Sequence, residues 1–565
     1  MLFNGIAWVY MAGLAYCYGW LSAAMLGRVV GTQPQLSIPL RLITGLGTLA
    51  AIATALSLVM PIGLAANGLL CLGALLLVPR AAFRLALKTD FAAFQAQLTL
   101  TDLGVLLIAL VLLLQSSVGP YNYDTGLYHL QAAKWIETYP AVPGLANLHT
   151  RLGFGSIWFP LAALFSFSEL LPQPLHALNG FLLLLGLLFA FSSLRTAASA
   201  PSAERVAQLL AAIALINLIY DRLRYAVEVS SLSTDMPVAV LILLTVVLSA
   251  QLLAGALKPP QRPAYVAVVV YFSLLAIAIK VSAAAIALLP AYLLLRFRQR
   301  WRSIALLITG TGAIALLPLL IRNVITSGYL VYPFYQIDLF SPDWKVPLET
   351  AIASRDALGT WVKAPGLSPA ELAAMGWGWL PGWWARVGSS LVFWAWPIAI
   401  AAFLLSWRVW PAAVSTIVQR WRWLYALLGL SLIVWFLSSP DIRLGYGYLA
   451  GLPLLLIAPG ATQLLSGLPT QQRRWVLTAY VFSCLLFSIA KFNFFITDLE
   501  FLTRPMDYPP PAVRALPLQG MTVHVPIQGD QCWNAELPCV PSTAKTWQPR
   551  GASLVEGFRP AQGQP

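Results

Sequence analysis

The sequence predicts an all-α integral membrane protein that crosses the bilayer many times. Hydrophobic residues make up 59% of the 565 residues, charged residues make up only 10%, and the mean hydropathy is +0.75. A soluble chain would carry roughly 25% charged residues. Apolar runs of about 15 to 22 residues recur along most of the chain, close to the length of about 20 that a bilayer demands. These observations exclude a soluble, disordered or collagen-like protein.

Taken in order, the apolar runs predict about fourteen spans, with a range of about 13 to 15. The runs lie near 3–27, 38–60, 62–79, 102–118, 174–194, 204–220, 236–255, 264–278, 280–296, 303–320, 388–406, 422–438, 444–460 and 475–494. The pair 264–278 and 280–296 has a second interpretation, a single broken helix. An even number of spans places both termini on one side of the membrane.

The basic residues orient these spans. If the N-terminus is outside, the cytoplasmic segments sum to +15 and the rest of the chain to −1, so the net charge of +14 is cytoplasmic, as the positive-inside rule predicts. The cytoplasmic Lys and Arg would be Arg28, Arg41, Arg80, Arg84, Lys88, Arg195, Arg205, Lys258, Arg262, Arg296, Arg298, Arg300, Arg302, Arg408, Arg420, Arg422, Arg473 and Arg474. Because they are scattered among short loops and form no basic face, we expect no nucleic-acid partner.

Three outer regions are large enough to hold a site, namely 119–173, 321–387 and the tail 495–565. Within the first region, the apolar run 153–170 is nearly long enough to cross. A crossing there would invert every later loop, so we expect an interfacial or re-entrant segment packed against protein. The sequence of the tail predicts a small appendage with one hairpin.

The five cysteines fall into two groups. Cys17, Cys71 and Cys484 lie inside apolar spans and are expected to pack there. Cys532 and Cys539 lie seven residues apart in the polar tail. In an oxidising compartment two such cysteines can close a short loop, so we predict a disulfide between them.

Acidic side chains at two outer span boundaries are candidates for chemistry. Asp124 follows an apolar run and precedes Tyr128 and His129, and a helix from Thr125 would place Asp124 and Tyr128 on one face. Asp235 immediately precedes another span. Each acid has a structural interpretation as a helix cap. Together, the two carboxylates could instead bind a divalent cation such as Mg²⁺ or Mn²⁺, or activate a hydroxyl nucleophile.

Three outer cations, Lys280, Arg322 and Arg443, run against the positive-inside bias. They suit a phosphate or an anionic lipid headgroup, for which a guanidinium is well matched. The alternative is a local ion pair, such as Asp441 with Arg443 or Asp221 with Arg222. No HExxH, Walker or dinucleotide fingerprint is present, so soluble-nucleotide chemistry is not supported.

Between residues 102 and 460 these features follow a recognisable order. Asp124-x-x-x-Tyr128 leads into an Ala-rich QAAKWI helix, and a second outer acid follows in STDMPVAVLILLTVVL. A lysine then lies in the hairpin AIAIKVSAAAIALLPAYLLL, followed by IRNVITSGYLVYPF and by Arg443 in PDIRLGYGYLAGLP. This arrangement resembles the GT-C class of integral membrane glycosyltransferases, which includes protein mannosyltransferases and aminoarabinose transferases.

The resemblance implies a domain plan and a set of roles. Residues 1–101 would hold three extra N-terminal spans and a cytoplasmic loop, and 102–494 the GT-C-like core, with juxtamembrane helices in the first outer loop. Asp124 would be the base or a metal-linked acid, and Asp235 the second-loop acid. The substrate would be bound by Tyr128, His129, Lys280, Arg322 and Arg443.

By this resemblance the protein would use a polyprenyl-phosphate sugar donor and a glycan, lipid or protein acceptor. The active site would lie on the extracytoplasmic face of a bacterial inner membrane. Two other functions stay open. A transporter or flippase would carry its charges at the bilayer midplane. An O-antigen polymerase or ligase would instead rely on the later loop, where Arg355 and Arg386 lie.

Overall fold

The computed structural model describes residues 1–94, 99–221, 226–297, 301–492, 499–543 and 546–561. Arg222, Arg298 and Arg300, which entered the charge and ion-pair predictions, lie outside these ranges. The described chain is predominantly helical and is a membrane protein by the length and composition of its helices.

Ten helical segments of the described chain are long and apolar enough to cross a membrane. They are Leu2–Val30 (α1), Ile38–Leu56 (α2), Leu178–Ser199 (α9, Leu178–Phe191, with α10, Leu194–Ser199), Asp235–Ala254 (α12), Pro259–Ile279 (α13, Arg262–Ile279), Ala305–Ser327 (the end of α15, Trp301–Ala315, with α16, Leu317–Ser327), Leu391–Val409 (α20), Pro411–Ser438 (α21), Ile442–Ser466 (α22) and Thr470–Ala490 (α23). Each coincides with an expected span.

The other four expected spans are occupied by shorter helices. They are α3 (Leu64–Leu75), α5 (Leu100–Gln115), α11 (Ala203–Asn217) and a 3₁₀ segment (η4, Val281–Ala287) with α14 (Leu288–Arg296). At 1.5 Å per residue, the 12 residues of α3 extend only about 18 Å. Length and composition therefore establish ten candidate spans and not the expected fourteen.

The polypeptide breaks at Lys280, between α13 and η4. Lys280 has an extended backbone (φ −156°, ψ 124°), and α14 packs back against α13. Residues 262–296 thus form a bent pair of segments, and Lys280 lies at the bend.

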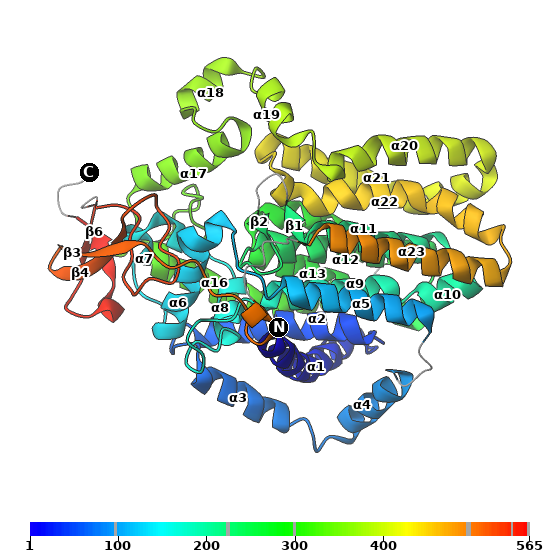
Figure 1. Cartoon of the computed structure of the whole chain (residues 1–565), viewed down its shortest axis with the longest axis horizontal. Helices are drawn as coiled ribbons and strands as arrows, with labels where there is room; N and C mark the ends of the chain where they lie inside the picture. Colours follow the sequence, from blue (N-terminus) through cyan, green and yellow to red (C-terminus); the bar gives the residue numbers. More distant parts are fainter. Residues whose placement is uncertain (95–98, 222–225, 298–300, 493–498, 544–545, 562–565) are drawn as a thin grey trace.

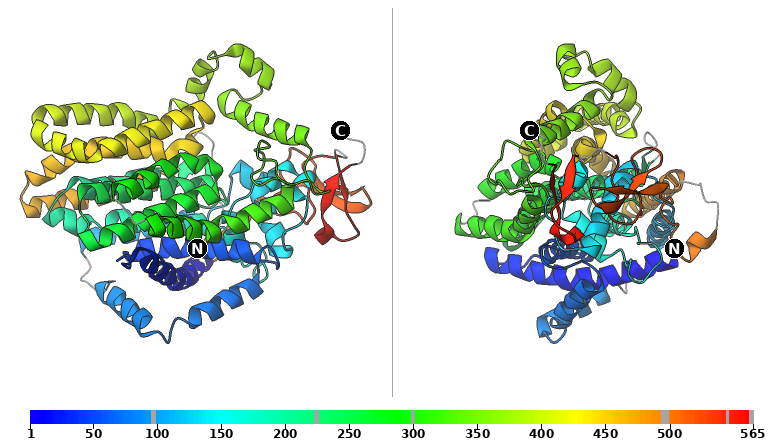
Figure 2. Two further views of the ribbon diagram at one scale, coloured as in Figure 1. Left: turned by 180° about the vertical axis from the view of Figure 1, so that it is seen from behind. Right: turned by 90° about the vertical axis from the view of Figure 1, so that its left-hand side faces the viewer.

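The long helices lie side by side along the long axis of the molecule, as Figures 1 and 2 show. Helix α12 is at the centre, where it contacts α9, α11, α13, α21 and α22 and buries nearly every residue. Helix α4 (Ala81–Phe94) follows α3 on the outside of the bundle (Figure 1).

The three outer regions gather at one end of this bundle (Figure 1). The first contains a π-helical turn (η1, Thr125–His129), α6 (Leu130–Thr138), α7 (Leu145–Leu148), a 3₁₀ turn (η2, Thr150–Gly153) and α8 (Trp158–Leu164). The run 153–170 therefore holds a helix of only 7 residues, too short to cross. The second contains α17 (Leu348–Lys363), α18 (Pro369–Met375) and α19 (Leu380–Val387).

The strands are few and short. β1 (Tyr220–Asp221) pairs antiparallel with β2 (Ala226–Val227) just before α12. The tail has two antiparallel hairpins where one was expected, β3 (Val513–Leu518) with β4 (Met521–Pro526) and β5 (Trp547–Pro549) with β6 (Phe558–Pro560). Short 3₁₀ turns precede α13 (η3, Pro259–Gln261) and occur in the tail (η5, Leu499–Leu502; η6, Leu554–Glu556).

Candidate functional site

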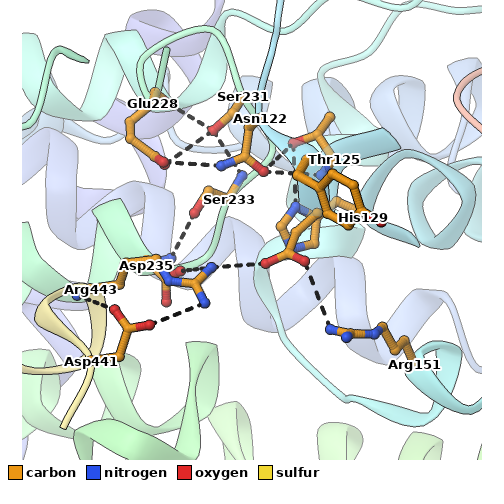
Figure 3. Close-up of polar contacts among 12 residues, drawn as sticks. Asn122, Thr125, His129, Arg151, Glu228, Ser231, Ser233, Asp235, Asp441 and Arg443 are labelled. Atoms are coloured by element: carbon orange, nitrogen blue, oxygen red, sulfur yellow. Dashed lines mark hydrogen bonds and ion pairs between the residues drawn. The ribbon is translucent and has the colours of Figure 1, made fainter. Parts of the chain in front are cut away.

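Four helix ends bring their charged side chains together at the end of the bundle that holds residues 119–173, and Figure 3 shows Asp235, Arg443 and their contacts. Asp124 lies between α5 and η1, and Asp235 is the first residue of α12. Lys280 follows the last residue of α13, and Arg443 is the second residue of α22. The fold thus joins residues that are more than 300 positions apart in the sequence.

Arg443 is the hub of this cluster. Its Nη1 donates a hydrogen bond to Asp124 Oδ2 at 2.9 Å and lies 3.6 Å from Asp235 Oδ2. Its Nη2 lies 3.5 Å from Asp441 Oδ2. The expected alternative, a local pair of Asp441 with Arg443, therefore coexists with the long-range contacts. Arg443 Nε is buried and finds no hydrogen-bond partner in the described part of the chain.

Two further cations, Lys280 and Arg151, balance the remaining negative charge of the carboxylates. Lys280 Nζ contacts Asp235 Oδ1 directly, and Arg151 Nη1 lies 3.8 Å from Asp124 Oδ1. The side chains of Asp124 and Arg443 each keep 21% of their surface exposed, so a ligand can reach the cluster from outside.

Neither acid caps a helix with its side chain. Asp124 makes no capping hydrogen bond, and Asn122 Oδ1 instead accepts from the Thr125 backbone N at 3.0 Å. The residue at the cap position of α12 is Thr234, and the carboxylate of Asp235 is engaged by Lys280. The capping interpretation therefore does not account for either acid.

The electrostatics keep Asp124 ionised. Burial by itself raises the pKa of a carboxyl group, but Arg443, His129 and Arg151 outweigh it and lower the pKa of Asp124 to about 2. At neutral pH the side chain is a carboxylate held by two guanidinium groups.

Tyr128 and His129 lie in the π-helical turn that follows Asp124, a local geometry that is often found at functional sites. Both side chains are buried, and their rings are 4.3 Å apart. The guanidinium of Arg151 lies 5.7 Å from the centre of the Tyr128 ring. Burial lowers the pKa of His129 to about 4, against the opposing effect of Asp124, so the imidazole is neutral at pH 7.

A buried hydrogen-bond network links the two acid-bearing loops (Figure 3). Asn122 Nδ2 donates to Glu228 Oε1 at 3.0 Å, and Ser231 Oγ donates to the Glu228 carbonyl at 2.9 Å. Burial, with the nearby Asp235 and Asp221, raises the pKa of Glu228 to about 7. Asn122 therefore ties the loop that carries Asp124 to the loop that carries Asp235.

Arg322 lies apart from this cluster. Its Nη1 donates to the Ser57 carbonyl at 3.2 Å and to Ser57 Oγ at 2.9 Å, and no acidic side chain of the described residues forms an ion pair with it. It lines a cavity of about 20 Å³, which has room for roughly one water molecule. Phe154 and Phe159 line this cavity and also contact the Tyr128 ring.

The carboxylates do not form an open metal site as they stand. Among the described residues there is no group of three or more His, Cys, Asp or Glu side chains that could hold a metal ion. Asp124 and Asp235 both face Arg443 Nη1, so a cationic group already lies where two carboxylates would share a divalent ion.

Comparison with known families places the chain in one of them. A family described as Domain of unknown function (DUF8201) matches residues 1–450, which include every charged residue of the cluster. The chain belongs to this family. No curated protein and no solved structure matches the chain. The family description names no activity.

The C-terminal tail of this DUF8201 protein packs directly on the segment that carries Asp124. Cys532 and Cys539 form a disulfide, and the loop that they close rests on η1 and α6. Trp533 N donates to the Gly126 carbonyl at 2.9 Å, and Gln131 Nε2 donates to the Trp533 carbonyl at 3.0 Å. The tail thus covers one side of η1 and α6.

Four residues of the cluster were not singled out as site residues from the sequence: Asn122, Arg151, Glu228 and Asp441. Asn122 and Asp441 lie two residues before Asp124 and Arg443, and this proximity in the sequence is the signal that could have found them. Arg151 and Glu228 carry no such signal. Which acid meets which cation was not visible, because it depends on how four separate helix ends are packed.

Proposed function

We propose that this DUF8201 protein is an integral membrane glycosyltransferase of the GT-C type. It transfers a sugar, with inversion, from a polyprenyl-phosphate donor to a glycan, lipid or protein acceptor. The reaction takes place on the extracytoplasmic face of a bacterial inner membrane. The observation that carries the proposal is the convergence of Asp124, Asp235, Lys280 and Arg443 at the outer end of the bundle.

The cations are suited to the phosphate of a lipid-linked donor. A guanidinium and an ammonium lie within one cluster, and the buried Nε of Arg443 still lacks an acceptor among the described residues. A phosphate oxygen would satisfy that N–H group and compete with the carboxylates for Arg443. Such a donor presents its sugar at the membrane surface, so the enzyme needs no nucleotide site.

Asp124 is the proposed base. In the free protein its low pKa makes it a weak base, because Arg443 and Arg151 stabilise the carboxylate. When the donor phosphate draws Arg443 away, the carboxylate loses that stabilisation and its basicity rises. It then accepts the proton of the acceptor hydroxyl, whose oxygen bonds to the anomeric carbon. The bond from that carbon to the phosphate oxygen breaks, and Arg443 and Lys280 hold the departing polyprenyl phosphate.

The proposal also includes the domain plan and the span count expected from the sequence. We assign residues 1–101 to three extra spans and a loop, and 102–494 to the GT-C-like core. In this assignment α3, α5, α11 and the η4–α14 pair cross together with the ten long helices. The packing of helix α11 against α9, α12 and α22 supports its crossing in this proposal, despite its 15 residues.

The position of the charges argues against a transporter or flippase. Transporters tend to place ionisable residues near the bilayer midplane, along a pathway. Here Asp235, Lys280 and Arg443 lie at the ends of α12, α13 and α22, and those ends are on one side of the bundle.

The later outer loop gives less support to an O-antigen polymerase or ligase. Arg355 donates to the Tyr335 hydroxyl at 3.0 Å, and Arg386 donates to the Lys363 carbonyl at 2.7 Å. Both side chains are exposed, and neither forms an ion pair with Asp124 or Asp235 in the described chain, although Arg386 interacts electrostatically with Asp441. The acids and cations best arranged for group transfer lie elsewhere.

The test is the substitution Asp124→Asn. We expect transfer to fall by about 10²-fold or more, because the proton acceptor is lost. The matched control is Asp338→Asn, which removes an exposed ion pair with Lys345 away from the cluster and should retain transfer. Lipid-linked saccharide and surface-glycan profiles are compared between cells with the wild type, each variant and no protein. Full activity of Asp124→Asn would eliminate Asp124 as the base.

Whether transfer needs a metal ion is tested separately. Since Arg443 lies between the two carboxylates, we expect transfer by the purified protein to continue when EDTA is added. Loss of transfer with EDTA, restored by Mg²⁺ or Mn²⁺, would instead assign Asp124 and Asp235 to a metal site.

A further inference from the structure

Tryptophans are concentrated in one short stretch of the chain. Residues 361–396 hold seven of the 21 tryptophans: Trp361, Trp377, Trp379, Trp383, Trp384, Trp394 and Trp396. We call residues 361–387, which include α18 and α19, the tryptophan arm. Figures 1 and 2 show it projecting sideways from the bundle, across the direction of the long helices.

One side of the arm is fixed to the bundle. Trp383 Nε1 donates to the Pro440 carbonyl at 2.6 Å, and the Trp377 ring stacks against Phe436 with centroids 6.5 Å apart. Trp379 and Trp383 are buried. The arm is therefore held in a defined position against the outer ends of α21 and α22.

Three tryptophans of the arm keep most of their aromatic surface uncovered by the described chain, although one face of Trp377 stacks on Phe436. Trp361 and Trp377 are each 60% exposed and Trp384 is 54% exposed. Burying such apolar side chains away from water is favourable. An exposed cluster of this kind marks a binding surface for another molecule or for a membrane.

The neighbouring span identifies the partner. Helix α20 begins four residues after α19 ends, and its exposed Leu391, Trp394 and Ile398 continue the aromatic surface of the arm onto a membrane-spanning helix. The arm thus lies at the depth where a span leaves the bilayer. Tryptophan is enriched at this depth because its ring is apolar and its N–H is polar.

The few charges of the arm fit the same depth. Its only charged residues are Lys363, Glu371 and Arg386. Arg386 Nη2 donates to the backbone carbonyl of Lys363 at 2.7 Å, and Lys363 Nζ lies 5.8 Å from the centre of the Trp379 ring, so the arm carries two cations. Such a pair suits the phosphates of lipid headgroups.

We propose that the tryptophan arm lies in the headgroup layer of the outer leaflet, with Trp361, Trp377 and Trp384 inserted among the lipids. The arm also contacts Pro440, the residue before Asp441, which in turn holds Arg443. Contact of the arm with lipid therefore helps to hold Asp441, and through it Arg443, in position. This inference does not depend on glycosyl transfer.

The test uses the full-length protein in phosphatidylcholine–phosphatidylglycerol nanodiscs. Cys17, Cys71 and Cys484 are replaced by Ala, and Trp377→Cys and Trp384→Cys are labelled separately with an environment-sensitive fluorophore. Ile527→Cys in the tail is the water-exposed control, and Leu404→Cys in the middle of α20 is the deep control. Lipids that carry a nitroxide at a shallow or a deep position quench the probes.

We expect the probes at 377 and 384 to be quenched mainly by the shallow nitroxide, with the probe at 527 quenched by neither. If the probes at 377 and 384 are quenched as little as the probe at 527, the proposal is overturned. The exposed tryptophans would then bind a protein partner. A second measurement guards against misfolded cysteine variants. The shallow nitroxide should quench less of the intrinsic tryptophan fluorescence in the double variant Trp377→Ala with Trp384→Ala than in the wild type. Equal quenching in the two proteins also overturns the proposal.

Discussion

At the scale of single residues, the cluster is a balanced set of buried and partly exposed charges. Arg443 contacts Asp124, Asp235 and Asp441, while Lys280 contacts Asp235. Removing one partner of such a set leaves an uncompensated charge and is costly, whereas the intact set gives a defined geometry. The loops that carry the acids are held in register by Asn122 and Glu228, so the geometry of the site depends on a neutral hydrogen bond as well as on ion pairs.

Glu228 should make stability depend on pH. Its pKa is raised from 4.5 to about 7, so between these values the unfolded state has released a proton that the folded state retains. The contribution of Glu228 to stability therefore falls as pH rises through this window and stays low above pH 7. We expect Glu228→Gln to be more stable than the wild type at pH 8, by up to about 3 kcal/mol, and to differ little at pH 4.5.

Thermal unfolding at pH 4.5, 6 and 8 measures this difference. The control is Glu349→Gln, which changes an exposed glutamate on α17. A Glu228→Gln variant whose difference from the wild type does not change with pH would contradict the raised pKa of Glu228.

At the scale of elements, the first outer loop is held between the bundle and the tail. The turn η1 carries Asp124 at its start, and the disulfide loop 532–539 covers its outer side. The approach is close at Gly126, where an added Cβ would lie 2.5 Å from the Trp533 ring. The position needs glycine for space and not for an unusual backbone angle.

Gly126→Ala should therefore displace the tail. We expect a loss of about 1–3 kcal/mol from the overpacked contact, with faster proteolysis of the tail. In Gly126→Ala with Trp533→Ala, the added methyl group meets no ring, so the double variant should be no less stable than Trp533→Ala alone. Gly13→Ala in α1 is the control, because a Cβ there meets nothing within 4 Å. Equal effects at Gly126 and Gly13 would contradict the contact.

At the scale of the whole molecule, the ends of the bundle differ in what they carry. One end holds the first outer loop, the tail hairpins and the charged cluster, while the other holds α10 and the turns between α20 and α21 and between α22 and α23 (Figure 1). The second end carries Arg195 in α10 and Arg473 in α23, and basic residues favour the cytoplasmic side.

Cysteine accessibility should reveal this orientation. We expect Ile527→Cys, in the tail, to react with a membrane-impermeant maleimide in intact cells. Gln471→Cys, in the first turn of α23, should react only after the membrane is permeabilised. Both positions are exposed, so a difference in labelling reports the side of the membrane. The reverse pattern would place the charged cluster inside the cell.

The sequence alone determined that this is a membrane protein built of helices, and it located the ten long helices. These follow from apolar runs, because the energy of transfer into a bilayer is a sum over neighbouring residues. It also singled out Asp124, Asp235, Lys280 and Arg443, since charged residues at outer span ends are rare enough to stand out.

Only the tertiary structure decided which of these residues meet. It joined Asp124 and Asp235 through Arg443, separated Arg322 from them, and added Asn122, Arg151 and Glu228. It also showed that four expected spans are short and that the tail packs on η1. These facts depend on contacts between segments hundreds of residues apart, and no local pattern of hydropathy or charge encodes such contacts.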